Sequence, residues 1–319
     1  MKDDRGRLSS PFFLSQQTEY RMTEQPVFDF SAEANVGRMP IWVRQSLGGG
    51  DYAMTTRAVH DNGLHTVCEE ARCPNRGECW SRGTATFMLL GDTCTRACGF
   101  CAVKTGKPQG LATDEPQRLA HAVQAMQLSY VVLTSVNRDD LADGGAPIFA
   151  QSIRQLRAQN PALGIELLTP DFQRTQTAAI TAITQAIQTA PGNKQLVWGH
   201  NIETVPRLYR RVRKGSDYQR SLELLTAVAQ CREFAAKTAL MLGLGERVDE
   251  VVEVLRDVRR AGVTRIALGQ YLRPTRYHLP VKEYIIPEQF AEYATIAHDL
   301  GFSWVKAGAM VRSSYHAET

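Results

Sequence analysis

Residues 68–103 read CEEARCPNRGECWSRGTATFMLLGDTCTRACGFCAV and hold six of the seven cysteines of the chain. The six form two triplets, Cys68-x4-Cys73-x5-Cys79 and Cys94-x3-Cys98-x2-Cys101. Between the triplets, residues 84–91 (TATFMLLG) are a short apolar run that predicts a buried strand. This strand is expected to present the second triplet at its C-terminal end.

Thiols placed this densely form disulfides, bind zinc or bind iron–sulfur clusters. Disulfide frameworks are typical of small secreted chains, whereas these 319 residues, 43% of them hydrophobic, can bury a large core. Structural zinc uses four ligands, usually as two closely spaced pairs, and neither triplet divides in that way. A 4Fe-4S cluster held by three thiolates keeps one iron open for another ligand. The pattern favours two iron–sulfur clusters, with disulfides and zinc as the alternatives.

Composition limits the partners and the location that we expect. The net charge of +4 is mild and the apolar runs are only as long as strands, so neither nucleic-acid nor membrane binding is indicated. Residues 1–36 lack the apolar core of a signal peptide and the acid-free, Arg-rich pattern of a transit sequence. We expect a cytoplasmic protein with a variable extension over 1–36, of which residues 1–21 are disordered or upstream of a second start at Met22.

After the cysteines, short β-rich runs alternate with helical stretches, which is typical of a parallel sheet. Strands are expected at 84–91, 129–135, 163–168, 195–199, 236–242 and 264–271, and helices at 115–126, 147–158, 174–188, 217–233, 248–261 and 287–300. Six such units predict an α/β fold, a partial (βα)6 barrel rather than a doubly wound sheet. Barrels of this kind carry reactive groups on the loops that follow their strands, so the second triplet is expected at the active-site face.

The chain divides into four parts on this interpretation. They are the extension 1–36, an N-terminal wrap and loop-rich first-triplet segment over 37–83, the barrel over 84–300, and a C-terminal segment over 301–319.

The octapeptide Cys94-Thr95-Arg96-Ala97-Cys98-Gly99-Phe100-Cys101 fits a CxxxCxxC pattern and resembles the cluster motif of radical S-adenosylmethionine (radical SAM) enzymes. The wider sequence resembles the lipoyl synthase family over residues 37–317. The similarity lies in residues 68–103, SVNRDDLADGGA (135–146), ETVPRLYRRVRKGSDYQRSL (203–222), MLGLGERVDEVVEVLRDVRRAGVT (241–264), LGQYLRPTRYHLPVKEY (268–284) and RSSYHA (312–317).

The resemblance implies a sulfurtransferase that inserts two sulfur atoms, at C6 and C8, into an octanoyl chain amide-linked to a lysine of a lipoyl carrier domain. It implies that the second triplet holds a 4Fe-4S cluster whose open iron binds S-adenosylmethionine, two molecules of which are consumed per lipoyl group. The first triplet is implied to hold an auxiliary 4Fe-4S cluster that supplies the sulfur. A serine of Arg312-Ser313-Ser314-Tyr315 is the implied fourth ligand, Ser314 rather than Ser313.

The resemblance also implies residues that contact S-adenosylmethionine: Phe100, Ser135, Asn201, Arg213 and Tyr271. Simpler roles remain open for several of them. Phe100 can shield the cluster from water, and Asn201, with His200, can satisfy loop hydrogen bonds. The run that holds Arg138, Asp139, Asp140 and Asp143 is either a solvated charge cluster or a functional loop.

Implied partners are octanoylated carrier domains, namely 2-oxoacid dehydrogenase E2 subunits and the glycine cleavage H protein, a ferredoxin- or flavodoxin-type reductant, and an iron–sulfur carrier for cluster repair. We expect a monomer. The basic segment 207–220 is expected to dock an acidic carrier or to hold the nucleoside. Cys231 is interpreted as a small buried apolar residue, and Gly243-Leu244-Gly245-Glu246 matches no phosphate-loop spacing. An electron carrier, another sulfur-inserting enzyme related to biotin synthase and a zinc protein are the competing functions.

Overall fold

The computed structural model describes residues 29–44, 59–70, 73, 75–82, 84–192 and 195–318. The expectations for residues 1–28, including the second start at Met22, lie outside this described part of the chain.

One eight-stranded sheet organises the described residues, in the order β1-β2-β5-β6-β7-β8-β9-β10. Its strands are β1 (His65–Thr66), β2 (Thr84–Leu89), β5 (Tyr130–Ser135), β6 (Gly164–Leu168), β7 (Leu196–Gly199), β8 (Phe234–Leu242), β9 (Arg265–Gln270) and β10 (Trp304–Gly308). Neighbouring strands are parallel except for the short β1, which pairs antiparallel with β2. Because β1 and β10 are its two edges, the sheet is an open barrel, and the predicted α/β partial-barrel class is confirmed.

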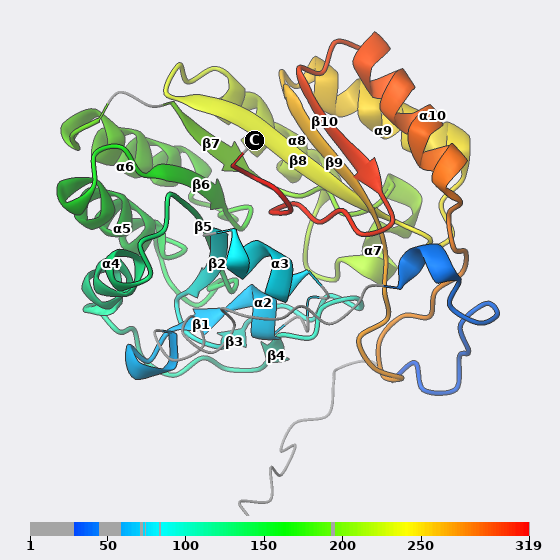
Figure 1. Ribbon diagram of the computed structural model, residues 1–319, viewed down its shortest axis with the longest axis horizontal. Coiled ribbons are helices and arrows are strands. Elements are labelled where there is room, and N and C mark those ends of the chain that lie inside the picture. Colours follow the sequence, from blue (N-terminus) through cyan, green and yellow to red (C-terminus); the bar gives the residue numbers. More distant parts are fainter. Residues whose placement is uncertain are drawn as a thin grey trace, which may run out of the picture.

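Helices connect the parallel strands in sequence order and cover the outer face of the sheet (Figure 1). They are α4 (Glu115–Ala125), α5 (Ala146–Gln159), α6 (Gln176–Thr189), α8 (Tyr218–Ala229), α9 (Val248–Arg260) and α10 (Pro287–Asp299). Helix α9 shows why they pack there: Val251, Val254, Leu255 and Val258 recur at helical spacing and are all buried. All six helices and all six strands expected from the sequence are present near the expected ranges.

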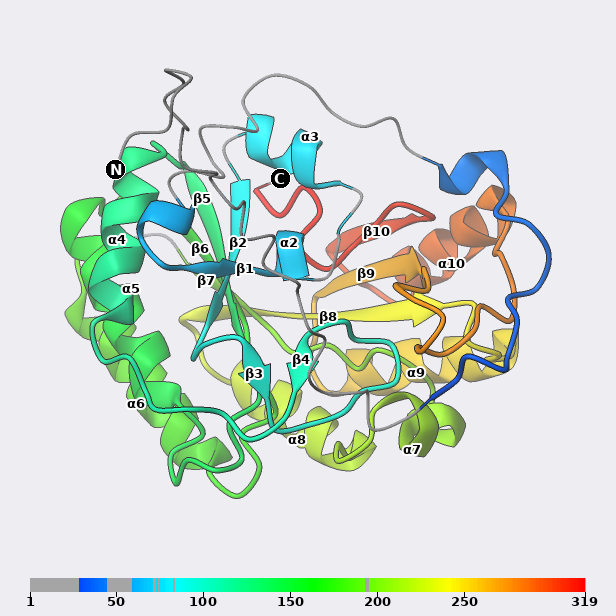
Figure 2. The same cartoon turned by 90° about the horizontal axis from the view of Figure 1, so that it is seen from below.

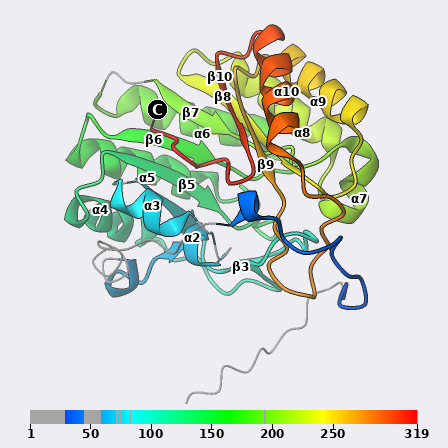
Figure 3. The same cartoon turned by 45° about the vertical axis from the view of Figure 1, so that its right-hand side comes forward.

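Shorter elements complete the fold. Helices α2 (Val67–Glu70) and α3 (Arg76–Ser81) precede β2, while β3 (Thr93–Cys94) and β4 (Lys104–Thr105) form a separate two-stranded sheet. The remaining elements are the 3-10 turns η1 (Ile41–Val43) and η2 (Pro206–Leu208) and the short helix α7 (Tyr209–Val212). Figures 2 and 3 show α2, α3 and the C-terminal segment inside the curve of the sheet, opposite the covering helices.

Strand β10 is the main element that the sequence interpretation missed. It pairs with β9 over five residues and extends the sheet into the range 301–319 that we treated as a C-terminal segment. Its residues, Trp304–Gly308, are all half-buried and show no alternation of apolar and polar side chains, so the periodicity that marks a strand is absent.

A buried ion pair lies in the sheet away from the cysteines. Lys237 Nζ donates to both carboxylate oxygens of Glu166 at 2.9 Å, and both side chains are about 1% exposed. Trp304 of β10 lies over the same ammonium at 4.6 Å, so the last strand helps to cover this charge. No helix among the described residues is both long and apolar enough to cross a membrane.

Candidate active site

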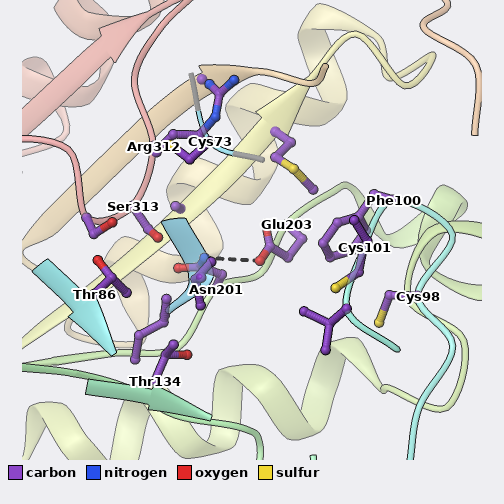
Figure 4. Close-up of a pocket in the computed structure, with 18 of the residues that line it drawn as sticks. Cys73, Thr86, Cys98, Phe100, Cys101, Thr134, Asn201, Glu203, Arg312 and Ser313 are labelled. Atoms are coloured by element: carbon purple, nitrogen blue, oxygen red, sulfur yellow. Dashed lines mark hydrogen bonds between the residues drawn. The ribbon is translucent and has the colours of Figure 1, made fainter. Parts of the chain in front are cut away.

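A cavity of about 480 Å³ opens inside the barrel at the C-terminal ends of its strands (Figure 4). Its wall combines residues from both cysteine triplets, from the loops that follow the strands and from the C-terminal segment. The residues predicted for the site that line this cavity are Cys68, Cys73, Cys94, Cys98, Phe100, Cys101, Ser135, Asn201, Arg213, Tyr271 and Ser314. Cys79 lines a second, smaller cavity beside it.

The second triplet lies on a tight loop that begins where β3 ends. The sulfur of Cys94 accepts backbone N–H bonds from Arg96 at 3.4 Å and from Asn137 at 3.3 Å. Gly99 is needed here because a Cβ atom at this position would lie 2.9 Å from the Leu279 side chain and 3.1 Å from the carbonyl oxygen of Arg211. The loop is therefore folded against the segments that carry Arg211 and Leu279.

Arg96, between two cysteines of this loop, fixes the loop to two neighbouring strand ends. Its side chain is 3% exposed and forms bidentate pairs with Asp139, after β5, and with Asp171, after β6, with distances of 2.7–2.9 Å. Arg220 of α8 donates to the same Asp171 at 2.8 Å. Although burial opposes ionisation, these arginine bonds hold the pKa of Asp171 well below its usual range. The network makes the loop a rigid platform for the second triplet.

The first triplet surrounds a small cavity of about 20 Å³ that adjoins the large one. Cys68, Cys73 and Cys79 line it together with Arg312 and Ser314 of the C-terminal segment. Ser313, the other candidate ligand, lines only the large cavity. Tertiary structure thus brings one serine of the pair to all three cysteines of the first triplet.

Hydrogen bonds join the C-terminal segment to α3, which carries the last cysteine of the first triplet. Asn75 Nδ2 donates to the carbonyl oxygen of Met310 at 2.6 Å. Glu78 of α3 accepts from the Tyr315 hydroxyl at 3.2 Å and lies 2.8 Å from His316 Nε2. These contacts hold residues 310–316 against the first triplet from both sides.

Burial keeps thiols in both triplets largely protonated when no metal is bound. Burial, followed by the nearby Cys73, raises the pKa of Cys68 to about 11. Burial also raises the pKa of Cys98 to about 11 and, together with Cys68 and Cys73, that of Cys79 to about 12. Thiols that ionise so poorly by themselves become thiolates readily when iron supplies the compensating charge. Soft sulfur donors around a shared cavity fit a 4Fe-4S cluster.

The described cysteines of the two triplets are separate thiols that line cavities. All seven cysteines are free thiols. Across the described residues, no three His, Cys, Asp or Glu side chains lie close enough together to hold one metal ion. The thiols of each triplet are instead distributed over the wall of a cavity.

Two polar atoms in the wall of the large cavity have no hydrogen-bond partner among the described residues. They are the Ser135 hydroxyl, at the end of β5, and Arg213 Nε. Because buried polar groups are rarely left unpaired, these two atoms mark where a polar ligand fits. Arg213 is already oriented, since its Nη1 donates to the Asn201 carbonyl oxygen and the Tyr209 hydroxyl, both at 2.7 Å.

Glu203 is a cavity residue that the sequence interpretation missed. It accepts a 3.0 Å hydrogen bond from Asn201 Nδ2, shown in Figure 4, and its backbone has a positive φ of 68°. Burial raises the pKa of this carboxyl group, and the charge of Arg213 opposes the rise. Its place just after β7, two residues beyond Asn201, was the available signal, because polar side chains after parallel strands meet at one face.

Two residues in the cavity wall have their polar groups bonded within the protein. His200 satisfies its loop, since its ring nitrogens lie 2.9 Å from the Thr169 carbonyl oxygen and 3.1 Å from the Ser221 hydroxyl. The Tyr271 hydroxyl donates to the Leu279 carbonyl oxygen at 2.8 Å, so only its ring is free to face a ligand.

The charge run after β5 is held by ion pairs and hydrogen bonds, although its three aspartates are exposed to solvent. Asp139 pairs with Arg96, and Arg138 pairs with Asp140. Asp143 accepts a bond from the Gly145 N–H at 2.8 Å. The run is therefore a structured loop that supports the second triplet.

The remaining motifs add no second centre. Cys231 is half-buried, and its thiol donates to the Ala227 carbonyl oxygen. Glu246 turns back and accepts the N–H groups of Gly243 and Leu244, which closes the turn after β8. In the basic segment 207–220, Arg207 pairs with Glu250, and Arg213 points inward.

Known proteins resemble this chain in both sequence and fold. The sequence pattern of the Radical SAM superfamily matches residues 88–270. Proteins named lipoyl synthase are similar over most of the chain: one from Methylococcus capsulatus is 50% identical over 286 residues, covering 88% of this chain and 86% of the relative. One from Klebsiella pneumoniae is 46% identical over 319 residues, covering 98% and 97%.

Among solved structures, Streptococcus suis SuiB bound to its precursor peptide SuiA matches with a TM-score of 0.53 at 10% identity. The match covers 87% of this chain and 58% of that one. At this identity the likeness shows a shared fold only.

Proposed function

The chain belongs to the lipoyl synthase family of the radical SAM superfamily, and from that premise we propose that it inserts sulfur at C6 and C8 of an octanoyl chain carried on a lipoyl domain. The observation that carries the proposal is the meeting of both cysteine triplets and Ser314 at two adjoining cavities. An electron carrier needs no such cavity between its centres, whereas a reaction on a fatty acyl chain does.

The second triplet would hold the cluster that binds S-adenosylmethionine, and the first triplet with Ser314 would hold the auxiliary cluster. When bound, these groups supply a one-electron cleavage of the sulfonium bond and a source of sulfur, chemistry that protein side chains lack. Two molecules of S-adenosylmethionine per lipoyl group follow from the two unactivated carbons.

The chain's own residues orient the reactants. The unpaired Ser135 hydroxyl and Arg213 Nε can bind the polar methionine part of S-adenosylmethionine, while the Glu203 carboxylate can accept hydroxyl groups of its nucleoside. Apolar wall residues, among them Met88, Val136, Leu240 and Met241, leave space for an alkyl chain and exclude water from it.

Ser314 is the proposed fourth ligand of the auxiliary cluster. The supporting observation is that Ser314 lines the first-triplet cavity and Ser313 does not. A serine oxygen is a harder ligand for iron than a thiolate, so it can be displaced when sulfur leaves. We predict that Ser314→Ala lowers iron retention on the first triplet at least tenfold under chelator challenge, while Ser313→Ala stays within twofold of the parent. Equal retention in both variants would remove Ser314 from this role.

The natural acyl donors would be the E2 and H-protein carriers, with a ferredoxin- or flavodoxin-type reductant and an iron–sulfur carrier for repair. The proposal is tested by anaerobic turnover of the reconstituted full chain with an octanoyl-lysine peptide, S-adenosylmethionine and dithionite, followed by mass spectrometry. We expect the peptide to gain two sulfur atoms. Formation of 5′-deoxyadenosine without any change to the peptide would show that the radical half is right and the substrate wrong.

A further inference from the structure

Arg312 presents a positive charge to the first-triplet cavity without a carboxylate partner. Within the described part of the chain, it donates only from Nη1, to the carbonyl oxygens of Val311 at 2.7 Å and Ala309 at 3.3 Å. It lines both cavities, in the wall that they share. Figure 4 shows its side chain next to Cys73.

A buried guanidinium requires a counter-charge nearby. Cys73 lines the same two cavities as Arg312, so a thiolate at this position can supply that counter-charge. The cation and the ligand set therefore complement each other, as buried charges must.

Charges on the other side of the first triplet are negative. Glu78 is adjacent to Cys79 in α3, and Glu318 accepts a hydrogen bond from Thr84, which lines the same small cavity. Arg76 also lines the small cavity, but it is paired with Glu69 at 3.5 Å. Of the two arginines in the small cavity, Arg312 is thus the one without a carboxylate partner among the described residues.

A cluster in this cavity would carry net negative charge, because three thiolates and a serine oxygen outweigh the charge of about +2 on an oxidised 4Fe-4S core. Taking up an electron makes it more negative. A fixed cation at short range in a poorly solvated site stabilises the reduced form more than the oxidised form. The cation therefore raises the reduction potential of the cluster.

We propose that Arg312 is a positioning residue for the auxiliary cluster, whose guanidinium balances the charge of that cluster and raises its reduction potential. This inference rests on the proposed function, because it assumes that the first triplet holds a cluster. It adds a role for the arginine of the C-terminal segment that is separate from the ligand role of Ser314.

The test uses the full chain with Cys94, Cys98 and Cys101 all replaced by alanine, so that only the first triplet can hold a cluster. After anaerobic reconstitution, iron is counted and the potential is measured by redox titration with electron paramagnetic resonance. Arg312→Gln removes the charge but keeps an N–H donor for the carbonyl oxygens. Arg312→Lys keeps the charge but loses the planar fork. Arg76→Met is the matched control.

We expect Arg312→Gln to lower the potential by at least about 59 mV, which is a tenfold change in a one-electron equilibrium. Arg312→Lys and Arg76→Met should each change that equilibrium less than threefold. An unchanged potential in Arg312→Gln, or an equal decrease in the glutamine and lysine variants, would overturn the inference. If Arg312→Gln loses its iron, the iron content of Arg312→Lys decides the question. Iron retained by Arg312→Lys supports the charge role, and iron lost from Arg312→Lys refutes it.

Failure of the proposed function has a different signature. In that case the parent with an intact Arg312 would bind no cluster of about four irons on its first triplet. If the parent binds the cluster and only the potential fails to move, the function stands and the role of Arg312 is wrong.

Discussion

Replacing Arg96 with methionine removes the cation at the centre of the loop network. Methionine fills a similar volume but leaves Asp171, which is fully buried, with Arg220 as its remaining arginine. Asp139, about 34% exposed, loses a bidentate partner but can be solvated. The buried carboxylate therefore dominates the expected loss.

The magnitude follows from burial and geometry. Removing one partner of a buried ion pair typically costs about 3–5 kcal/mol, because the remaining charge is poorly solvated. Arg96→Lys keeps the charge but cannot serve two carboxylates through a planar fork, so we expect about 1–3 kcal/mol. Arg138 is a matched control: its side chain is also about 3% exposed, but its partner Asp140 is about 37% exposed. Arg138→Met should cost less, about 1–2 kcal/mol.

The assay is anaerobic urea denaturation of the cluster-free full chain, followed by circular dichroism. The free energy of unfolding should be highest for the parent, lower for Arg138→Met and lowest for Arg96→Met. Iron counted after reconstitution of each variant should fall most in Arg96→Met, because its loop carries the second triplet. An Arg96→Met variant with the same free energy of unfolding as the parent, or one that is no less stable than Arg138→Met, would refute the reasoning.

Three further results are expected. Gly269→Ala should displace the C-terminal segment and weaken iron retention on the first triplet severalfold, because a Cβ at this position would overlap the Val311 carbonyl oxygen. Gly308→Ala is the control: its Cβ would lie 3.6 Å from the nearest atom, so this variant should retain iron like the parent. Burial and the charge of Arg213 lower the pKa of His200 to about 4, whereas it is about 6.5 in the unfolded chain. The unfolded chain therefore binds a proton first as the pH falls, and the cluster-free protein should lose about 2 kcal/mol of stability between pH 7 and pH 5. Urea denaturation at each pH measures this loss, which His200→Gln should not show. Glu203→Gln should weaken binding of S-adenosylmethionine about tenfold in equilibrium dialysis, since an amide offers one acceptor where the carboxylate offers two; unchanged binding would exclude the carboxylate from the site.

The sequence was sufficient for the elements that carry a strong local signal. Strands such as β2, whose six residues are all buried, appear as short runs of apolar and β-branched residues because a parallel sheet is covered on both faces. Strand β10 carried no such signal, because its side chains are half-buried at the edge of the sheet. Glu203 was missed although its place just after β7 was a signal, because position alone does not tell whether a carboxylate points into a cavity or to water.

By itself, the sequence determined the chemistry of this protein: two cysteine triplets with fixed spacings, a strand that delivers the second, and a serine pair near the end of the chain. Only the tertiary structure decided which groups meet. It brought Ser314 into the small cavity with all three cysteines of the first triplet, across more than 200 residues of sequence, and placed Arg312 in the wall that the two cavities share. The physical reason is that ligand type and spacing are local properties of a chain, whereas burial and charge balance depend on which distant segments pack against each other.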